Sequence, residues 1–359
     1  MNKTIIQSAL TMSEPDPYIH SETNIPKYLS FGMDKFLAAI TTDMVKMKAA
    51  SGLSELDIAT HCTLYYLFHF WRFAKTIYDF SPTFLAMLEQ TEDAPIYPDI
   101  LKRLPYRDFV MSLPSGLDYD GMFVHIEFDE SYGANDVDTL FLLCPFKSSS
   151  SPNNISYTLE MQWVLSKKMF RKTYRDYKTA MDDAAKNGEG RSGDITIHSA
   201  PDDQPIVDID ARNADYTLKE RLLCIAVAAS YYLASKNAEI KEVKIPQSQR
   251  TIAPVKGKGR PKRVAIKAYQ VGYTFGKSFE QQVTAQNTVR DQAVGQRNGL
   301  TVRPHVRRAH WHHYWTGAGR TILEVRWIQP TLVLPNEKKE TELATIRKVS
   351  GDSASTTSV

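Results

Sequence analysis

The densest group of chemically capable side chains lies near the C-terminal end, in residues 303–320, which read RPHVRRAHWHHYWTGAGR. This segment holds four of the nine histidines, four arginines and three large aromatic residues. A solvated loop gains little from two tryptophans, and a packed core excludes unpaired guanidinium groups. The mixture predicts a surface that holds a polar or anionic ligand against flat apolar faces.

The histidines of this segment raise the question of a metal or a catalytic site. A zinc site needs three or four ligands in a closed geometry. In an extended segment His312 and His313 point to opposite sides, so His310 and His312 share one face. No H-E-x-x-H pattern is present, and the neighbouring arginines repel a cation, so we predict no metal site and no cofactor.

Two alternatives to a metal site stay open. The first is a ribonuclease, in which His310 and His312 would serve as acid and base beside an arginine that stabilises the developing charge. Recognition without catalysis needs only arginine forks for phosphate or carboxylate, with Trp311, Tyr314 and Trp315 as stacking faces for bases or peptide side chains. This second interpretation accounts better for the residue mixture, so we predict a binding protein and assign no catalytic residue.

The charge of the chain is unevenly distributed. Residues 1–241 contain 24 Lys+Arg and 33 Asp+Glu, a balance of −9, whereas residues 242–359 contain 20 and 8, a balance of +12, and the two sum to the net +3. A basic Gly/Pro-containing stretch, KGKGRPKR, contributes to this excess. Such asymmetry points to an anionic partner, nucleic acid first. The predicted basic patch comprises Lys256, Lys258, Arg260, Lys262 and Arg263.

Length and composition set the class of protein. The chain has 359 residues, of which 42% are hydrophobic and 24% charged, as in ordinary globular proteins. No run approaches the ~18 apolar residues of a membrane span, and the N-terminal sequence lacks the apolar core of a secretory signal. The three cysteines, Cys62, Cys144 and Cys224, are too few and too far apart for a disulfide framework. We therefore expect a cytoplasmic protein.

Hydrophobic periodicity predicts helices in the first third of the chain and a sheet after it. Helices are expected at residues 33–50, 54–78 and 81–89, and a buried helix at residues 215–235. Strands are expected at residues 122–128, 139–146, 157–165, 240–245, 264–273 and 321–334, the last interrupted by Pro330. His125, on a strand among apolar neighbours, is expected to be a core histidine with its hydrogen bonds satisfied.

These elements indicate an α+β fold, with an N-terminal helical region and a mostly antiparallel sheet with packed helices. We divide the chain into a helical N-terminal region at 1–115, an α+β domain with a basic C-terminal part at 116–336, and a disordered tail at 337–359.

The residues 303–320, followed by EVRWIQPTLVL, resemble the C-terminal signature of a family of type V-A anti-CRISPR proteins. The block LPSGLDYDGMFVHIEF and the stretches 217–239 and 250–276 are similar in the same order. One departure is His313, where the family pattern has a small residue. The resemblance implies a binding role for Arg303, His305, Arg307, Arg308, His310, Trp311, His312, Tyr314, Trp315, Arg326 and Trp327.

The resemblance also implies a mode of action. Proteins of this family, carried by phages and plasmids, lower the amount of the type V CRISPR effector nuclease in the bacterial host cell. They recognise the N-terminal segment of the nascent nuclease on the ribosome, and the encoding mRNA is then degraded. The expected partners are therefore that N-terminal peptide and the ribosome or mRNA, with no membrane. The alternatives are an RNA-cleaving nuclease and a general nucleic-acid-binding protein of mobile elements.

Overall fold

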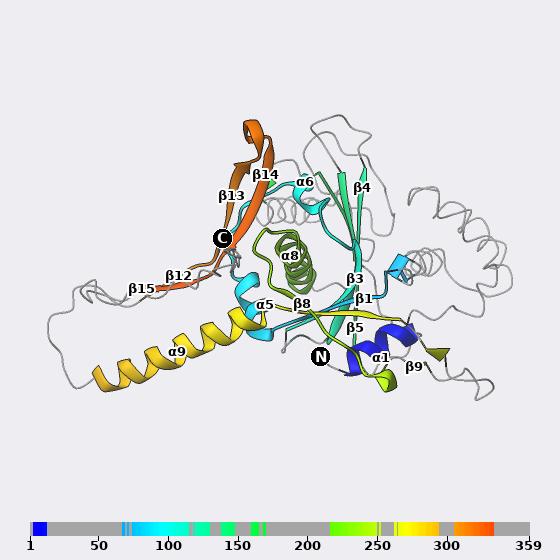
Figure 1. Cartoon of the computed structure of the whole chain (residues 1–359), viewed down its shortest axis with the longest axis horizontal. Coiled ribbons are helices and arrows are strands. Elements are labelled where there is room, and N and C mark those ends of the chain that lie inside the picture. Colours follow the sequence, from blue (N-terminus) through cyan, green and yellow to red (C-terminus); the bar gives the residue numbers. More distant parts are fainter. Residues whose placement is uncertain are drawn as a thin grey trace, which may run out of the picture.

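The structure is a computed structural model of the whole chain, shown in Figure 1. It describes residues 3–12, 67–68, 70–71, 74–114, 117, 119–129, 138–147, 159–164, 168–169, 216–249, 251–252, 262–263, 265–293 and 305–333. The helix predicted at residues 33–50 and the tail predicted at residues 337–359 lie outside these ranges.

A seven-stranded sheet forms one layer of the protein, with the strand order β6-β5-β4-β3-β1-β11-β8. Strand β1 runs parallel to both of its neighbours, and the remaining neighbours pair in antiparallel fashion. The sheet is therefore mixed and mostly antiparallel, which confirms the α+β prediction. Its strands are β1 (Thr76–Phe80), β3 (Asp108–Ser112), β4 (Gly121–Asp129), β5 (Asp138–Phe146), β6 (Leu159–Val164), β8 (Ile240–Glu242) and β11 (Lys267–Val271).

Four two-stranded pairs and several helices complete the described part of the chain. The pairs are β2 (Pro95–Ile96) with β7 (Lys168–Met169), β9 (Thr251–Ile252) with β10 (Lys262–Arg263), β12 (His305–Arg307) with β15 (Thr331–Val333), and β13 (His310–Thr316) with β14 (Ile322–Ile328). The helices are α1 (Lys3–Met12), α5 (Pro82–Glu89), α6 (Pro98–Leu101), α8 (Tyr216–Leu233) and α9 (Tyr273–Ala293), with the short 3-10 turns η2 (Gln247–Gln249) and η4 (Ala318–Arg320). None of these helices is long and apolar enough to cross a bilayer.

The predicted strands appear as β4, β5, β6, β8 and β11, with β6, β8 and β11 shorter than expected. Pro330 separates β14 from β15, as predicted. Helix α5 also matches, and its N-cap is Ser81, whose Oγ accepts a hydrogen bond from the Phe84 amide at 3.4 Å. Helix α9 was missed, because its polar sequence carries little apolar periodicity.

The prediction of a single helix across residues 54–78 is wrong at its C-terminal end. The helix stops before Lys75, whose φ of 43° is left-handed, and residues 76–80 form β1. All five residues of β1 are buried, because the strand lies inside the sheet. A short run that is apolar on every side fits a buried strand as well as a buried helix. The predicted boundary between the N-terminal region and the α+β domain, after residue 115, lies between β3 and β4, which pair in the same sheet. The division into domains stays a prediction.

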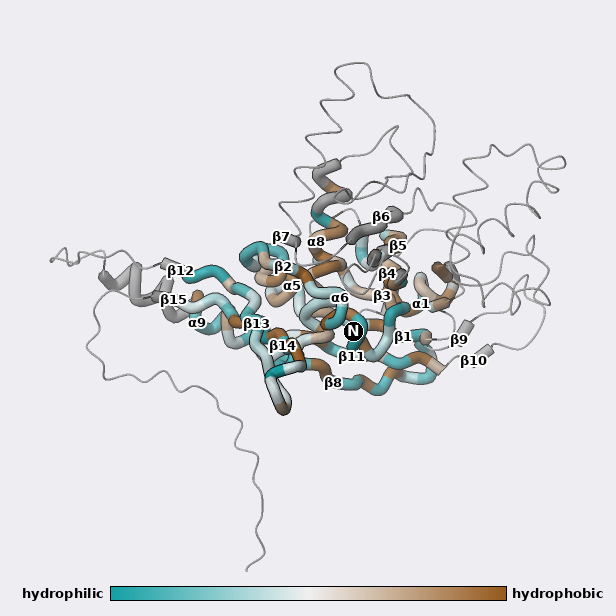
Figure 2. The backbone as a smooth tube through the Cα atoms, turned by 90° about the horizontal axis from the view of Figure 1, so that it is seen from above, coloured by the Kyte–Doolittle hydropathy of each residue, from teal (hydrophilic) through white to brown (hydrophobic). Residues whose placement is uncertain are grey.

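Helix α8 occupies the centre of the molecule, between the seven-stranded sheet and the β13–β14 pair (Figure 1). Its residues from Leu222 to Leu233 are all buried, and the coloured part of α8 is mostly hydrophobic in Figure 2. A helix that is covered on opposite sides has to be apolar around its whole circumference. This confirms the prediction of a buried helix, which had been drawn at residues 215–235. Arg221, near the N-terminal end of α8, ties this helix to α5 through both carboxylate oxygens of Glu89, at 2.5 and 3.1 Å.

His125 on β4 is a core histidine, as expected. Its Nδ1 lies 2.5 Å from Oδ1 of Asp108, the residue directly opposite on β3, and its Nε2 lies 3.6 Å from the carboxylate of Glu127. Burial lowers the pKa of His125, but the two carboxylates outweigh that effect and raise it to about 9. The imidazolium is therefore a fixed structural cation in the sheet at neutral pH.

The junction between β11 and α9 requires a glycine. Gly272 has a φ of 68°, and a Cβ built on it would lie 2.1 Å from Cδ1 of Phe84, inside the core. The helix that follows is held at its N-terminus by Glu239, whose carboxylate accepts hydrogen bonds from the amides of Thr274 and Phe275. The glycine thus lets α9 leave the sheet without displacing the Phe84 ring.

Gly272→Ala is expected to lower the free energy of unfolding by about 3 kcal/mol or more, from left-handed backbone strain added to a core clash. Gly319→Ala is the matched control, because its φ is 71° but its nearest neighbour, Cγ2 of Thr321, lies 3.8 Å from the added Cβ. That control should lose only about 1–2 kcal/mol. Urea unfolding of both variants measures the difference, and equal losses would contradict the clash at Phe84.

Candidate binding surface on the C-terminal hairpin

The segment singled out from the sequence folds into a β-hairpin, here called the C-terminal hairpin, made of β13, β14 and the turn between them. The register pairs His310 with Ile328 at one end and Thr316 with Ile322 at the other. The turn contains Gly317 and Gly319 with φ of 79° and 71°. Left-handed backbone of this kind explains the two glycines of the motif WTGAGR.

One face of the hairpin, the inner face, packs against α8. It carries the odd-numbered residues Trp311, His313, Leu323, Val325 and Trp327, because side chains alternate along a strand. The rings of Trp311 and Tyr231 meet edge to face at 5.0 Å. Leu323, Val325 and Trp327 are buried in the same hydrophobic cluster as α8. The inner face therefore fixes the hairpin to the core.

Trp327 is enclosed in that core, with 1% of its surface exposed. Its indole N–H donates to Oγ1 of Thr91 at 3.0 Å, and its ring contacts three aromatic rings, those of Phe84, Tyr232 and Phe275. The sequence predicts Trp327 as a binding residue, but a side chain enclosed in this way does not reach a ligand. Its role is to anchor β14, which corrects the sequence prediction for this residue.

His313 also belongs to the inner face, apart from the other histidines. Its Nε2 lies 2.7 Å from the hydroxyl of Tyr231, and its ring contacts that of Tyr97. Burial, with a smaller contribution from the charge of His312, lowers the pKa of His313, whereas burial raises the pKa of Tyr231. Tyr231 therefore keeps its proton and His313 is neutral, and the two share one hydrogen bond whose direction follows the imidazole tautomer, so His313 is a packing residue.

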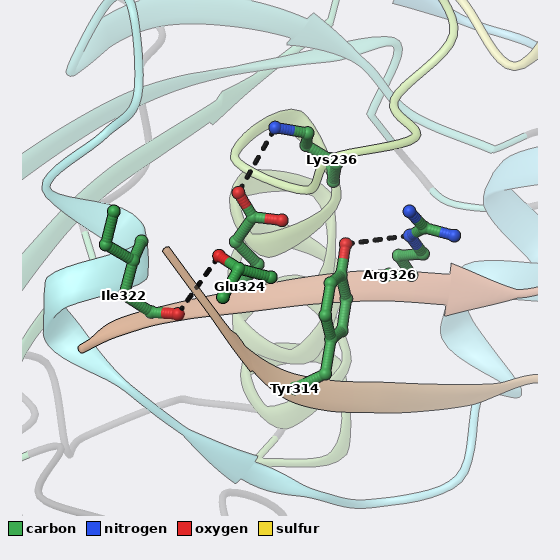
Figure 3. Close-up of polar contacts among 6 residues, drawn as sticks. Lys236, Tyr314, Ile322, Glu324 and Arg326 are labelled. Carbon is green, nitrogen blue, oxygen red and sulfur yellow. Dashed lines mark hydrogen bonds and ion pairs between the residues drawn. The ribbon is translucent and has the colours of Figure 1, made fainter. Parts of the chain in front are cut away.

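The opposite, outer face carries four of the predicted recognition residues, His310, His312, Tyr314 and Arg326, of which Figure 3 shows Tyr314 and Arg326. The Nε of Arg326 donates to the hydroxyl of Tyr314 at 2.7 Å, and its guanidinium carbon lies 5.0 Å from the centre of the Tyr314 ring. The His312 ring stacks on the same tyrosine at 6.0 Å. Arg326 is exposed and uses only Nε for its hydrogen bond to Tyr314, so its two terminal nitrogens can bind a carboxylate or phosphate.

A neighbouring ion pair limits the negative charge of the outer face. Nζ of Lys236 donates to the carboxylate of Glu324 at 3.1 Å. This hydrogen bond is the main reason why the pKa of Glu324 is lowered. With Glu324 neutralised by Lys236, the exposed Arg307, Arg308 and Arg326 leave the hairpin region with excess positive charge.

The tip of the hairpin extends past α8 and exposes apolar surface. Trp315 is 57% exposed and Ile322 46% exposed, although both are large hydrophobic residues. Arg320, in the turn, is exposed beside them. An exposed tryptophan next to arginines fits the predicted recognition surface better than a packing role.

The remaining predicted residues are placed only in part. Arg303 lies outside the described residues, and of His305 only the backbone in β12 is described. The predicted basic patch is likewise described only in part. Lys256, Lys258 and Arg260 lie outside the described residues, and of Lys262 and Arg263 only the backbone in β10 is described. Their role as ligand-binding residues stays a prediction.

Three residues that sequence analysis missed complete the site. Asn237 and Lys236 follow α8 and bind the backbone and side chains of β14, and Thr91 binds Trp327. They lie between 88 and 236 positions away from their partners in the chain. No local pattern marks such residues, since they are ordinary turn and helix-end types.

His310 and His312 share the outer face, as the extended geometry predicted, while His313 lies on the other. Among the described residues, no group of three or more His, Cys, Asp or Glu side chains is arranged to hold a metal ion. The candidate site is therefore a projecting hairpin, with a packed inner face and an outer face of arginine and aromatic side chains.

Comparison with known proteins identifies the family. Residues 78–335 match the AcrVA2-like family, described as the anti-CRISPR type V subtype A2 family. The match spans more than half of the chain, so this protein belongs to that family of anti-CRISPR proteins against type V-A systems. The resemblance noted in the C-terminal signature is thereby confirmed.

A solved structure described as "Crystal structure of AcrVA2" is similar to the chain, with 14% sequence identity, coverage of 92% of this chain and 94% of that one, and a TM-score of 0.46. A search of curated proteins gave no match.

The lowered pKa of His313 predicts a pH dependence of stability. The unfolded chain takes up a proton near pH 6.5, whereas the folded ring stays neutral to lower pH, so the contribution of His313 to stability is lost as the pH falls below about 6.5. His313→Gln keeps an acceptor for Tyr231 and cannot titrate. Between pH 7.5 and about 5, this variant should lose less unfolding free energy than the wild type. Parallel profiles from urea unfolding would contradict the assignment.

Proposed function

We propose that this protein inhibits type V-A CRISPR immunity by recognising the N-terminal segment of the nascent effector nuclease and triggering loss of the encoding mRNA. Membership of the anti-CRISPR family supports the target system. The observation that carries the recognition step is the exposed part of the C-terminal hairpin: Arg326 is held by Tyr314 on the outer face, and Trp315 is exposed at the hairpin tip.

This surface suits a peptide because it combines two kinds of contact on a rigid base. The oriented guanidinium of Arg326 offers paired donors to a carboxylate, and the Trp315 indole offers a broad apolar face to a side chain. Because the inner face packs against α8 and Tyr314 holds the guanidinium, Arg326 loses little conformational freedom when the ligand binds. Preorganised arginine and tryptophan side chains are the types that dominate the binding free energy of peptide and protein interfaces.

The proposal needs no cofactor and no catalytic residue on this chain. The protein would act in the cytoplasm of the bacterial host cell, where nascent chains emerge from ribosomes. The basic residues 256–263 and the exposed Arg307 and Arg308 would supply contacts with ribosome or mRNA, since clustered lysine and arginine side chains bind phosphate backbones. Recognition of the emerging peptide would then select one mRNA among many.

Expression of the protein together with an effector gene should lower the mRNA of that gene. Recoding the first residues of the effector to a different peptide sequence should abolish the effect, whereas synonymous recoding of the same codons should preserve it. Quantification of the effector mRNA measures both. An unchanged mRNA level with intact inhibitor protein would refute the proposal.

Variants of the inhibitor test the hairpin in the same assay. Arg326→Ala combined with Trp315→Ala should restore most of the effector mRNA. Lys241→Ala, which removes an exposed positive charge from β8 in the sheet, should not. Purified protein incubated with RNA, with and without a chelator, separates this proposal from the ribonuclease alternative: cleavage that depends on His310 and His312 would favour the nuclease.

A further inference from the structure

The two edges of the C-terminal hairpin differ in how their backbone groups are satisfied. Along the edge of β14, the carbonyl of Val325 accepts from the amide of Lys236 at 2.9 Å. The amide of Trp327 donates to Oδ1 of Asn237 at 3.0 Å, and the carbonyl of Trp327 accepts from Nδ2 of the same residue at 2.8 Å. The segment after α8 therefore closes this edge with a side-chain amide that imitates a neighbouring strand.

These contacts reveal the hydrogen-bonding pattern of the whole hairpin. In an antiparallel pair, opposite residues alternate between those that bond each other and those whose backbone groups point away from the partner strand. Val325 and Trp327 point away from β13, so the residues opposite them, His313 and Trp311, point away from β14. By the same alternation, the backbone N–H and C=O of Trp315, which lies opposite Leu323, also point away from β14.

The free edge of β13 thus presents the N–H and C=O groups of three residues, Trp311, His313 and Trp315. In the part of the chain that the structure describes, β13 has β14 as its only strand partner, and no hydrogen bond engages those outward groups. Figure 1 shows β13 on the outer side of the hairpin, farther from the seven-stranded sheet than β14. An edge of this kind is a template for another strand.

We propose that β13 binds its peptide by strand addition: an extended, acidic segment pairs with the outward backbone groups of Trp311, His313 and Trp315. The inference rests on the proposed function, because it takes the peptide partner from it and specifies how that peptide is held. Backbone pairing supplies the affinity in this mode of recognition, and the alternate side chains supply the specificity.

The flanking side chains define the composition of the added strand. Its residues on the outer face would lie beside His312 and Tyr314, with the guanidinium of Arg326 behind them, and near the exposed Arg308 and Arg320. Carboxylate side chains match that positive charge, since Glu324 is already paired with Lys236. On the inner face, Trp315 favours an apolar side chain at the hairpin tip. The expected pattern alternates acidic and apolar residues.

Other occupants fit this edge less well. A second copy of β13 would bring the arginines and histidines of two hairpins together, and like charges on neighbouring strands are destabilising. RNA lacks the regularly spaced amide donors that a β-ladder requires, although it could contact the arginines. The chemistry of the edge therefore favours an acidic peptide over another copy or a nucleic acid.

The test uses wild-type, full-length protein and synthetic peptides that cover the N-terminal segment of a type V-A effector nuclease. The tightest-binding peptide is resynthesised with one backbone nitrogen methylated at a time, and affinities are measured by calorimetry. Methylation should weaken binding about tenfold, which corresponds to about 1.4 kcal/mol, at every second position across the paired stretch and have little effect between them, since each of those positions loses one ladder bond. Replacing the acidic residues of the peptide with lysine should also abolish binding.

A matched pair of protein variants tests the same edge from the other side. Trp315→Ala removes the indole but keeps the backbone N–H, whereas Trp315→Pro removes both. Proline is tolerated on an edge strand where the N–H faces outward, so both variants should melt within a few degrees of each other. Trp315→Pro should bind the peptide about tenfold more weakly than Trp315→Ala. Equal affinities would contradict a ladder bond at this residue.

The outcomes separate this inference from the proposed function. Peptide binding without an alternating methylation pattern would overturn strand addition and leave the proposed function standing. Absence of peptide binding would also overturn strand addition, while the mRNA assay in cells decides the proposed function independently. Competition by single-stranded RNA with no sequence preference, or concentration-dependent dimerisation abolished by Trp315→Pro, would assign the edge to a different occupant and overturn the inference.

Discussion

The burial of Trp327 is the interaction on which the rest of the structure depends. Its ring joins α5, α8 and α9 through Phe84, Tyr232 and Phe275, and its indole N–H reaches Thr91. Removing a buried aromatic side chain of this size typically costs about 3–5 kcal/mol, comparable to a large part of the stability of a domain. The hairpin is therefore part of the core at one face and a candidate binding surface at the other.

The conspicuous residues of the C-terminal motif divide between these two faces, because odd-numbered and even-numbered residues of a strand point to opposite sides. The odd-numbered residues face α8, and Trp311 and His313 contact Tyr231 there. The even-numbered residues face solvent, where Tyr314 holds Arg326. Trp315 is odd-numbered yet exposed, because the hairpin tip extends beyond the helix that covers the rest of the face. A motif that looks like one cluster in the sequence is thus two surfaces separated by the thickness of a strand.

Rigidity and asymmetry together suit the hairpin for binding. Asn237 and Lys236 satisfy the backbone of β14, so that strand cannot pair elsewhere. The other strand keeps an edge whose geometry is set by its partner and not by a ligand. Exposed edges are usually protected against uncontrolled pairing, and positive charge is one common protection. The exposed Arg307 and Arg308, which precede β13, are a protection of that kind.

The sequence by itself determined the α+β class and the positions of β4, β5, β6 and α8, because alternation, continuous apolar runs and helical periodicity are local signals. It also singled out residues 303–320 as a candidate site by their unusual residue mixture. It also placed His310 and His312 on one face. Only the tertiary structure decided that Thr76–Phe80 is a strand, that Trp327 is enclosed, and which edge of the hairpin is open. Those properties depend on partners such as Thr91, Phe84 and Asn237, which are distant in the chain, and burial by distant partners leaves no pattern in a local stretch of sequence.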